Sequence, residues 1–231
     1  MREIVLDTET TGLNPAEGHR LVEIGAIEIV NQIATGAVFH ALINPERDVP
    51  ADAARIHGHT SAILRDKPTF SAVVDELLAF LGADRLVIHN AEFDMRFLNF
   101  ELDRAGRAPI GNERVLDTLA LARRKHPGLS NSLDALCDRY RIDRSHRIKH
   151  GALLDAEILV EVYSELSGGR QRSLSLAPEA ATRKSRAAKS LAGEPRPALL
   201  PERLSPQERA AHAAHVASLG AQAIWRRYEK N

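Results

Sequence analysis

The chain has 231 residues, of which 44% are apolar and only 4% aromatic, and its 31 basic and 31 acidic side chains leave no net charge. This length suits one well-buried domain with extensions, and a single cysteine, Cys137, excludes internal disulfides and indicates a reducing compartment. Neither a signal pattern nor an apolar run of about 18 residues is present, so we expect a cytoplasmic protein with no membrane partner.

The apolar patterns predict an α/β fold. Three β-rich runs without helix-length connections predict an antiparallel meander, and they lie near residues 2–7, 21–30 and 36–43. Strands near 85–89 and 114–117 follow, among helical patterns near 69–81, 91–105, 117–125, 131–139 and 151–166. This order predicts a mixed sheet flanked by helices.

The first strand ends in two acids, Asp7 and Glu9. Side chains two apart on a strand point the same way, so both carboxylates can meet one cation while Thr8 faces elsewhere. Hard oxygen ligands favour Mg²⁺ or Mn²⁺. Taken alone, the segment could equally be a polar strand end that enters a turn at Thr11 and Gly12.

Two further segments carry acids after an apolar run or before one. A strand that ends at His89 and Asn90 leads into a helical pattern whose first turn holds Asp94, and His150 precedes Asp155 at the start of another helical pattern. Residues five apart are poorly aligned on a helix, so His150 has to lie at or before the first turn to reach the same site. Four carboxylates without matching bases suit two cations, and a histidine can accept a proton from water near neutral pH.

The order and spacing of these motifs resemble the DEDDh family of 3′-to-5′ exonucleases. The family's three motifs are matched in turn by Asp7-Thr-Glu9, by the segment from Asn90 to Asp94, and by the H-x-A-x-x-D pattern from His150 to Asp155. The resemblance implies a ribonuclease H-like fold, a general base at His150, and two divalent cations, Mg²⁺ or Mn²⁺, held by Asp7, Glu9, Asp94 and Asp155.

Finer matches resemble the epsilon, or proofreading, subunits of bacterial DNA polymerase III. They are Leu21–Glu28, Asn131–Cys137 and His150–Ala156. The resemblance covers residues 2–167 and, more weakly, 204–228. It implies that DNA 3′ ends and the polymerase alpha subunit are the partners of this chain.

The resemblance also indicates residues at the terminal nucleotide. His57 matches a position where the family contacts that nucleotide, and Asp52 stands where this branch often has Glu; a solvated loop histidine and a helix-start acid are the alternatives. Side chains that stack or offer backbone contacts bind any base, and Phe93 could equally belong to the core. The expected substrate contacts are Asp7, Glu9, Thr10, Leu13, Asp52, His57, Asn90, Phe93 and Asp155.

Beyond Gly168 the composition changes. Residues 168–200 contain Gly, Ser, Ala, Pro and scattered bases without an apolar period, which predicts a flexible linker. Residues 168–231 carry 12 Lys and Arg against 5 Asp and Glu, so they bear +7 and residues 1–167 bear −7. Within the linker, a segment resembles the glutamine-led motif that docks polymerase-associated proteins on the sliding clamp, with a plain linker as the alternative. Its clamp-binding residues are Gln171, Leu174 and Leu176.

Residues 201–231 predict a tethered helix. The stretch from Ser205 to Glu208 is a capping box with Pro at the first helical position, and Gly220 is a stop signal. An aromatic cluster without a core of its own indicates an anchor for another protein, and it resembles the polymerase-binding tail of epsilon subunits. A frayed tail is the alternative. The cluster consists of Ile224, Trp225 and Tyr228.

We therefore expect an exonuclease domain at 1–167, a linker at 168–200 and a polymerase-binding tail at 201–231. Such a protein would remove mispaired 3′-terminal nucleotides as 5′-monophosphates and serve as the proofreading subunit of a replicase. The alternatives are a DEDDh ribonuclease that trims RNA 3′ ends and a scaffold that mainly stabilises the polymerase. The acids do not separate DNA from RNA, because selection at the 2′-hydroxyl depends on pocket shape.

Overall fold

The computed structural model describes residues 1–145, 149–168 and 205–220. The chain divides near residue 175 into two compact units, of which the first holds the sheet and most of the helices. In the second unit, the described part is one helix, α8 (Pro206–Ser218). The predicted clamp segment from Gln171 to Leu176 and the cluster from Ile224 to Tyr228 lie outside the described residues.

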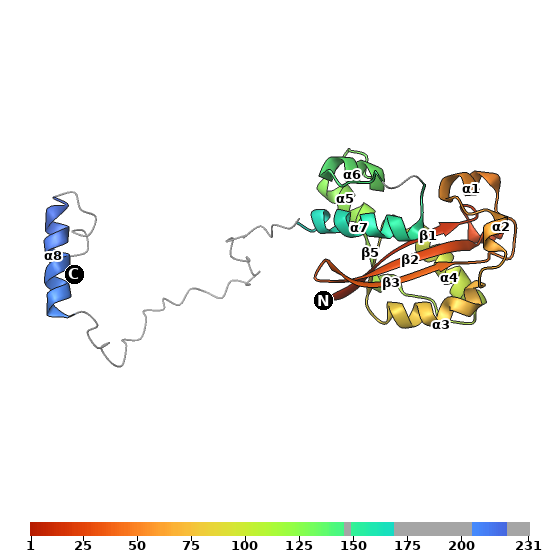
Figure 1. The fold of residues 1–231 in the computed structure, drawn as a ribbon, viewed down its shortest axis with the longest axis horizontal. Coiled ribbons are helices and arrows are strands. Elements are labelled where there is room, and N and C mark those ends of the chain that lie inside the picture. Colours follow the sequence, from red (N-terminus) through yellow and green to blue (C-terminus); the bar gives the residue numbers. More distant parts are fainter. Residues whose placement is uncertain (146–148, 169–204, 221–231) are drawn as a thin grey trace, which may run out of the picture. The chain divides into compact units, whose positions relative to one another are not determined.

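One five-stranded mixed sheet forms the centre of the first unit, with the strand order β3-β2-β1-β4-β5 (Figure 1). The strands β1 (Arg2–Thr10), β2 (Leu21–Val30) and β3 (Ile33–Leu42) pair antiparallel, which confirms the predicted meander. The strands β4 (Arg85–Ile88) and β5 (Val115–Asp117) continue the sheet parallel to β1. The central strand β1 therefore has neighbours on both sides.

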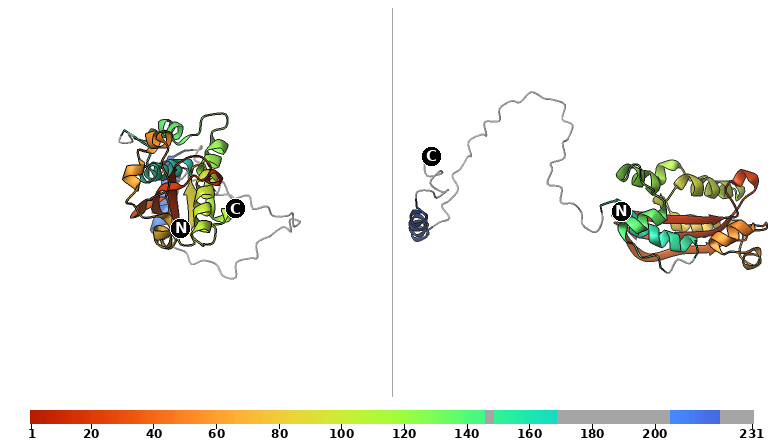
Figure 2. Two further views of the ribbon diagram at one scale, coloured as in Figure 1. Left: turned by 90° about the vertical axis from the view of Figure 1, so that its right-hand side faces the viewer. Right: turned by 90° about the horizontal axis from the view of Figure 1, so that it is seen from above.

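Helices cover both faces of the sheet (Figure 1, and end-on in the left view of Figure 2). One layer contains α3 (Phe70–Leu81) and α4 (Ala91–Arg104), and the other contains α5 (Thr118–Lys125), α6 (Leu133–Tyr140) and α7 (Ala152–Leu166). Each layer packs on its own apolar cluster. Along β1, Ile4 and Leu6 belong to the α4 cluster and Val5 to the α7 cluster, as the alternation of a strand requires.

The connections contain short helices that the sequence patterns did not predict. They are η1 (Pro15–Glu17), α1 (Ala51–His57), α2 (Ser61–Leu64) and η2 (Asn112–Arg114). Elements this short have too few residues for an apolar period, so their local signal is weak. The first two matter for function because η1 and α1 both contribute residues to a cavity that Glu9 of β1 lines.

The capping box predicted for the second unit is present at the start of α8. The Ser205 hydroxyl accepts a hydrogen bond from the backbone N–H of Glu208, and the Glu208 carboxylate accepts one from the backbone N–H of Ser205. The helix ends at Ser218, and Gly220 adopts a left-handed conformation with φ of 76°. None of the helices in the described part of the chain has the length and apolar character needed to cross a bilayer.

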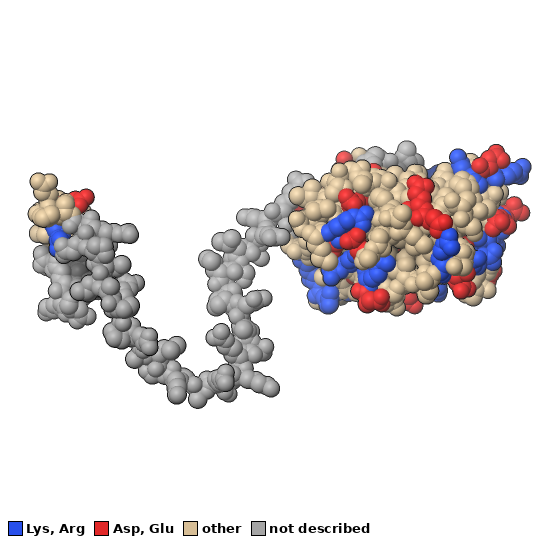
Figure 3. Space-filling view, turned by 90° about the horizontal axis from the view of Figure 1, so that it is seen from below, with Lys and Arg blue, Asp and Glu red and all other residues tan. Residues whose placement is uncertain are grey.

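Charged side chains are mixed on one face of the first unit. On the face drawn in Figure 3, acidic and basic groups are interspersed over an otherwise uncharged surface. This face offers no broad basic area for duplex DNA, so a nucleic-acid contact on it has to be local.

Candidate active site

The strand β1 delivers two carboxylates to the face of the sheet that α7 covers. Val5 packs against α7, and the alternation of the strand puts Asp7 and Glu9 on the same face. In the antiparallel register, Asp7 lies opposite Gly25 and Glu9 opposite Glu23. Both acids are half-buried at the end of the strand.

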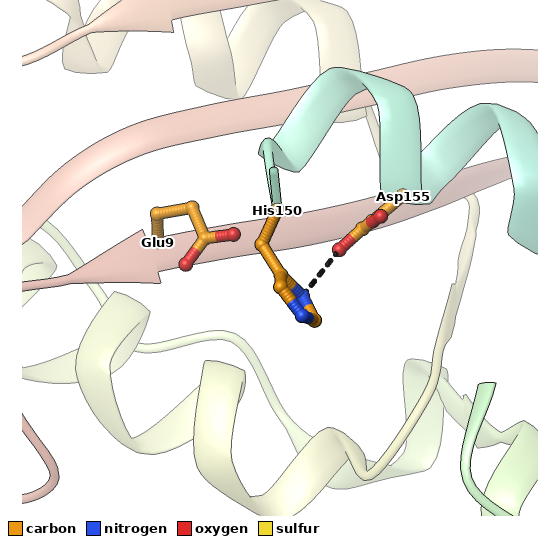
Figure 4. A group of neighbouring side chains, drawn as sticks. All are labelled: Glu9, His150 and Asp155. Atoms are coloured by element: carbon orange, nitrogen blue, oxygen red, sulfur yellow. Dashed lines mark hydrogen bonds and ion pairs between the residues drawn. The ribbon is translucent and has the colours of Figure 1, made fainter. Parts of the chain in front are cut away.

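The N-terminal end of α7 brings a histidine and a third acid to the same place. The helix begins at Ala152 with Gly151 as its N-cap, so His150 precedes the first turn and Asp155 lies in it. The Nδ1 atom of His150 is 3.2 Å from Oδ2 of Asp155. Glu9, His150 and Asp155 offer ligand atoms within 4.8 Å of one another, and no other His, Cys, Asp or Glu group of three does so among the described residues. Figure 4 shows the three side chains between the end of β1 and the start of α7.

A fourth acid approaches β1 from the opposite layer. Asp94 lies in the first turn of α4, where its Oδ1 accepts a hydrogen bond of 2.7 Å from the Thr8 hydroxyl. Burial raises the pKa of Asp94 to about 7, although the Thr8 hydrogen bond acts in the opposite direction. A buried carboxyl of this kind gains from a nearby cation, because the cation favours its charged form.

The donor set fits a hard divalent cation. Carboxylate oxygens are the ligands that such ions prefer, and Glu9 and Asp155 form with His150 a group whose ligand atoms lie within 4.8 Å of one another. Asp7 and Asp94 lie outside that group, but Asp7 shares a face of β1 with Glu9 and Asp94 is bonded to the intervening Thr8. The structure thus collects three of the five predicted residues, with Asp7 on the same strand end and Asp94 on α4 bonded to that strand through Thr8.

Asn90 occupies the turn between β4 and α4 in a left-handed conformation, with φ of 64° and ψ of 50°. Its backbone N–H donates to Oδ1 of Asp117 at 3.1 Å, and the same oxygen caps α5 by accepting from the N–H of Leu119 at 2.8 Å. Sequence analysis missed Asp117, whose position at a strand end before a helix was the available signal. Asn90 lines a cavity of about 680 Å³ together with Arg123 and Asn131.

A second cavity, of about 500 Å³, opens beside Glu9. Leu13 is 77% exposed at its rim, on the loop after β1. Phe93 is half-buried, with its ring centroid 5.1 Å from that of Phe97, so it borders both the core and the cavity. Asp52 is exposed on α1 and forms an ion pair with Arg55. Besides Glu9, five predicted substrate residues line the cavity: Thr10, Leu13, Asp52, His57 and Phe93.

His57 is a buried histidine, only 4% exposed, so the alternative of a solvated loop residue is wrong. Its Nδ1 accepts a hydrogen bond of 3.0 Å from the backbone N–H of His59, and its Nε2 has no hydrogen-bond partner among the described residues. Burial, followed by the neighbouring His59, lowers the pKa of His57 to about 4. The ring is therefore neutral at physiological pH, with the proton on Nε2.

Comparisons with known proteins agree with this geometry. The family model described as an exonuclease, RNase_T, matches residues 4–163. The DNA polymerase III subunit epsilon of Rickettsia felis is 54% identical over 179 residues, which are 76% of this chain and 78% of that protein. The subunit of the same name from Escherichia coli strain K12 is 50% identical over 188 residues, 78% of this chain and 77% of its own.

Solved structures share the fold. Exonuclease X in complex with 5′ overhanging duplex DNA superposes with a TM-score of 0.58 at 28% identity, over 71% of this chain and 90% of that one. A 3′-exonuclease that recognises a histone mRNA stem-loop has a TM-score of 0.61 at 16% identity, over 74% of this chain and 65% of that one, and shows the fold alone. The chain belongs to the exonuclease family and, within it, to the epsilon subunits of DNA polymerase III.

Proposed function

We propose that the protein removes mispaired nucleotides from DNA 3′ ends as 5′-monophosphates, as the proofreading subunit of a cytoplasmic replicative polymerase. The observation that carries this proposal is the group of Glu9, His150 and Asp155 at the edge of the cavity that Glu9 also lines. A ligand group for divalent ions thus stands next to a space lined by a phenyl ring, a buried imidazole and an exposed leucine. Such a site binds a nucleotide and places its phosphate at the acids.

His150 serves as the general base. Its Nδ1–H faces the Asp155 carboxylate at 3.2 Å, which holds the ring and leaves Nε2 as the atom that accepts a proton. The proton comes from the water that attacks the terminal phosphorus. The bond from phosphorus to the 3′ oxygen of the preceding nucleotide breaks, and the mononucleotide leaves with a 5′-phosphate.

The four acids are the proposed ligands for the cations. Divalent ions held by Asp7, Glu9, Asp94 and Asp155 would activate the water and offset the charge of the phosphate. Asp94 has to lose its proton first, because burial raises its pKa to about 7. The Thr8 hydroxyl then donates to a charged oxygen and orients the carboxylate.

The cavity beside Glu9 holds the terminal nucleotide. Phe93 offers a ring for stacking, which any base can use. His57 offers the proton of Nε2, and its lowered pKa keeps the ring neutral beside the phosphate. Leu13 is exposed at the rim, where it can contact the base on entry. These contacts do not distinguish one base from another, which is required of an enzyme that trims ends of any sequence.

The first experiment tests the chemistry. Asp155→Ala should abolish hydrolysis and weaken Mn²⁺ binding measured by calorimetry, whereas His150→Ala should keep Mn²⁺ binding and lose about 10²- to 10⁴-fold in kcat. His126→Ala is the matched control. The His126 ring lies at the end of α5 and is hydrogen-bonded to the hydroxyl of Tyr140, so its removal should leave the rate unchanged. Full activity of His150→Ala across neutral pH would contradict the mechanism.

The second experiment separates the DNA proofreader from an RNA nuclease and a scaffold. Single-stranded DNA, a mismatched primer and RNA of equal length are compared as substrates, with and without polymerase. We expect hydrolysis of the two DNA substrates, and faster hydrolysis of the mismatched primer when polymerase is present. Faster hydrolysis of RNA than of DNA would favour the ribonuclease alternative. Hydrolysis of none of the three substrates would favour the scaffold alternative.

The proposed partners are the polymerase alpha subunit and, through a weaker contact, the sliding clamp. Residues 1–167 form the proposed catalytic domain, 168–200 the linker and 201–231 the tail.

In the full chain, Trp225→Ala should weaken copurification with the polymerase, because buried aromatic anchors often contribute about 2 kcal/mol or more. Replacing Gln171, Leu174 and Leu176 by Ala should weaken clamp binding alone. Unchanged binding in both assays would leave the tail and the linker without these roles.

A further inference from the structure

Glu23 is a buried glutamate next to the site, and it belongs neither to the predicted acids nor to the ligand group. Its carboxylate is 4% exposed and accepts three hydrogen bonds. Oε1 is 2.8 Å from Nε2 of His40. Oε2 is 2.8 Å from Nε2 of His59 and accepts a hydrogen bond of 3.0 Å from the backbone N–H of Ala152. Both oxygens are thus engaged by protein groups, so Glu23 is not a spare cation ligand.

The bond to Ala152 is the one with a consequence for catalysis. Ala152 is the first residue of α7, next in sequence to the Gly151 cap that follows His150. A carboxylate at a helix N-terminus satisfies an N–H group that the helix leaves unpaired and lies at the positive end of the helix dipole. Burial works against the charge of Glu23, but the bonds from His59, Ala152 and His40 prevail and lower its pKa to about 2.

The backbone around His150 has a second tie, to the other side of the nucleotide cavity. The N–H of His150 donates to the carbonyl of Ile56 at 3.2 Å, in the last turn of α1. Glu23 holds His59, two residues beyond that helix, and Ala152, two residues beyond His150. The segment that carries the base and the segment that carries His57 are therefore fixed to each other and to β2.

The register of the sheet connects this arrangement to the metal ligands. Glu23 lies opposite Glu9 across the β1–β2 pair, and Gly25 lies opposite Asp7. All four residues face α7, because directly paired residues of an antiparallel ladder share a face. One strand pair thus presents the acids on β1 and the helix anchor on β2.

We propose that Glu23 is a positioning residue, which sets the location of His150 and Asp155 relative to Glu9 by holding the first turn of α7 on β2. The proposal rests on the proposed exonuclease function, since it assigns Glu23 a role in that reaction. The property that matters is the reach of the acceptor oxygen to Ala152. The negative charge of the side chain is secondary.

Two conservative variants separate reach from charge. Glu23→Gln keeps the chain length and an amide oxygen for Ala152 and His59, with its NH₂ group toward His40. Glu23→Asp keeps the charge but withdraws both oxygens by one methylene. The expected kcat of Glu23→Gln on single-stranded DNA lies within about 3-fold of the parent, whereas that of Glu23→Asp falls by about 10- to 10²-fold, because small misplacements of reacting groups cost that much. KM should change by less than about 3-fold in both.

The control is Glu3, a second buried glutamate bonded to the same helix at its other end. It is 5% exposed, and its Oε1 accepts a hydrogen bond of 3.2 Å from the hydroxyl of Tyr163, near the C-terminal end of α7. Glu3→Asp should lower the unfolding midpoint without changing kcat. A merely structural Glu23 would behave like Glu3.

A readout independent of activity is hydrogen exchange at the Ala152 amide. Glu23→Asp should lose protection there, and Glu23→Gln should keep it. Impairment of Glu23→Gln equal to that of Glu23→Asp, an effect confined to KM, or a kcat of Glu23→Asp equal to that of Glu3→Asp would overturn the proposal. If the parent cuts no nucleic acid, the proposed function fails, while the exchange data still decide whether Glu23 holds the helix.

Discussion

Substitution of Gly25 by Ala should remove most of the catalytic rate in a protein that still folds. A Cβ atom at this position would lie 2.3 Å from the backbone nitrogen of Leu153 and 2.4 Å from the carbonyl carbon of Ala152. Ordinary contact begins at 3.4 Å, so the first turn of α7 has to retreat by about 1.1 Å, the difference between 3.4 and 2.3 Å. Backbone atoms have no rotamer by which to move aside.

The retreat should carry Asp155, which lies in this turn, and His150, which directly precedes it, away from Glu9. A misplacement of about 1 Å costs about 10²-fold in rate, and overpacking of this kind costs about 1–3 kcal/mol in stability. The assay is kcat on a single-stranded oligonucleotide, with urea unfolding of the same preparation. The expected result is a folded protein with about 1% of the parent rate.

Gly111 provides a matched control. A Cβ atom there would lie 2.1 Å from a carboxylate oxygen of Glu113, but that group is the end of a flexible side chain and can rotate away. The backbone φ of Gly111 is −74°, which Ala adopts readily. Gly111→Ala should therefore be close to the parent in rate and stability. A Gly25→Ala protein with parental kcat would refute the inference that α7 is in contact with β2 at this residue.

Two further predictions concern stability. The folded-state pKa of Glu23 is about 2 against an ordinary 4.5, so the stabilisation that its charge provides is present above pH 4.5 and is lost as the pH falls toward 2. This difference in pKa corresponds to about 3 kcal/mol. The free energies of urea unfolding of the parent and of Glu23→Gln should therefore converge at the acidic end of that range. Glu101→Ala should lower the free energy of unfolding by about 3–5 kcal/mol, because the buried guanidinium of Arg20 loses a bidentate partner whose Oε2 lies 2.8 Å from its Nη2. Asp75→Ala breaks the exposed pair with Arg107 and should lower it by less than about 1 kcal/mol in the same assay.

The parts of the site that the sequence predicted are those with a local signal. The position of His150 before the first turn of a helix follows from five residues of spacing, and the shared face of Asp7 and Glu9 follows from the period of a strand. The mixed sheet followed from the order of the apolar patterns. In each case, every pattern used comes from residues that are close together in the chain.

The parts that sequence reasoning missed depend on contacts between distant segments. Glu23 and Ala152 are 129 residues apart, and Thr8 and Asp94 are 86 apart. No periodicity connects such pairs, because their contact is decided by the packing of whole helices on the sheet. The burial of His57 likewise depends on how α1 lies over the strand ends. Its motif position suggested a role, but only the fold shows that the ring is buried, which lowers its pKa to about 4.

The two-sided origin of the acids has a consequence for partly unfolded copies of the protein. Asp155 belongs to the helical layer on one face of β1, and Asp94, held through Thr8, belongs to the layer on the other. Local opening of either layer, which proteins undergo without complete unfolding, separates the carboxylates. With the proposed ligand set, a partly opened copy therefore loses its activity before it loses its sheet.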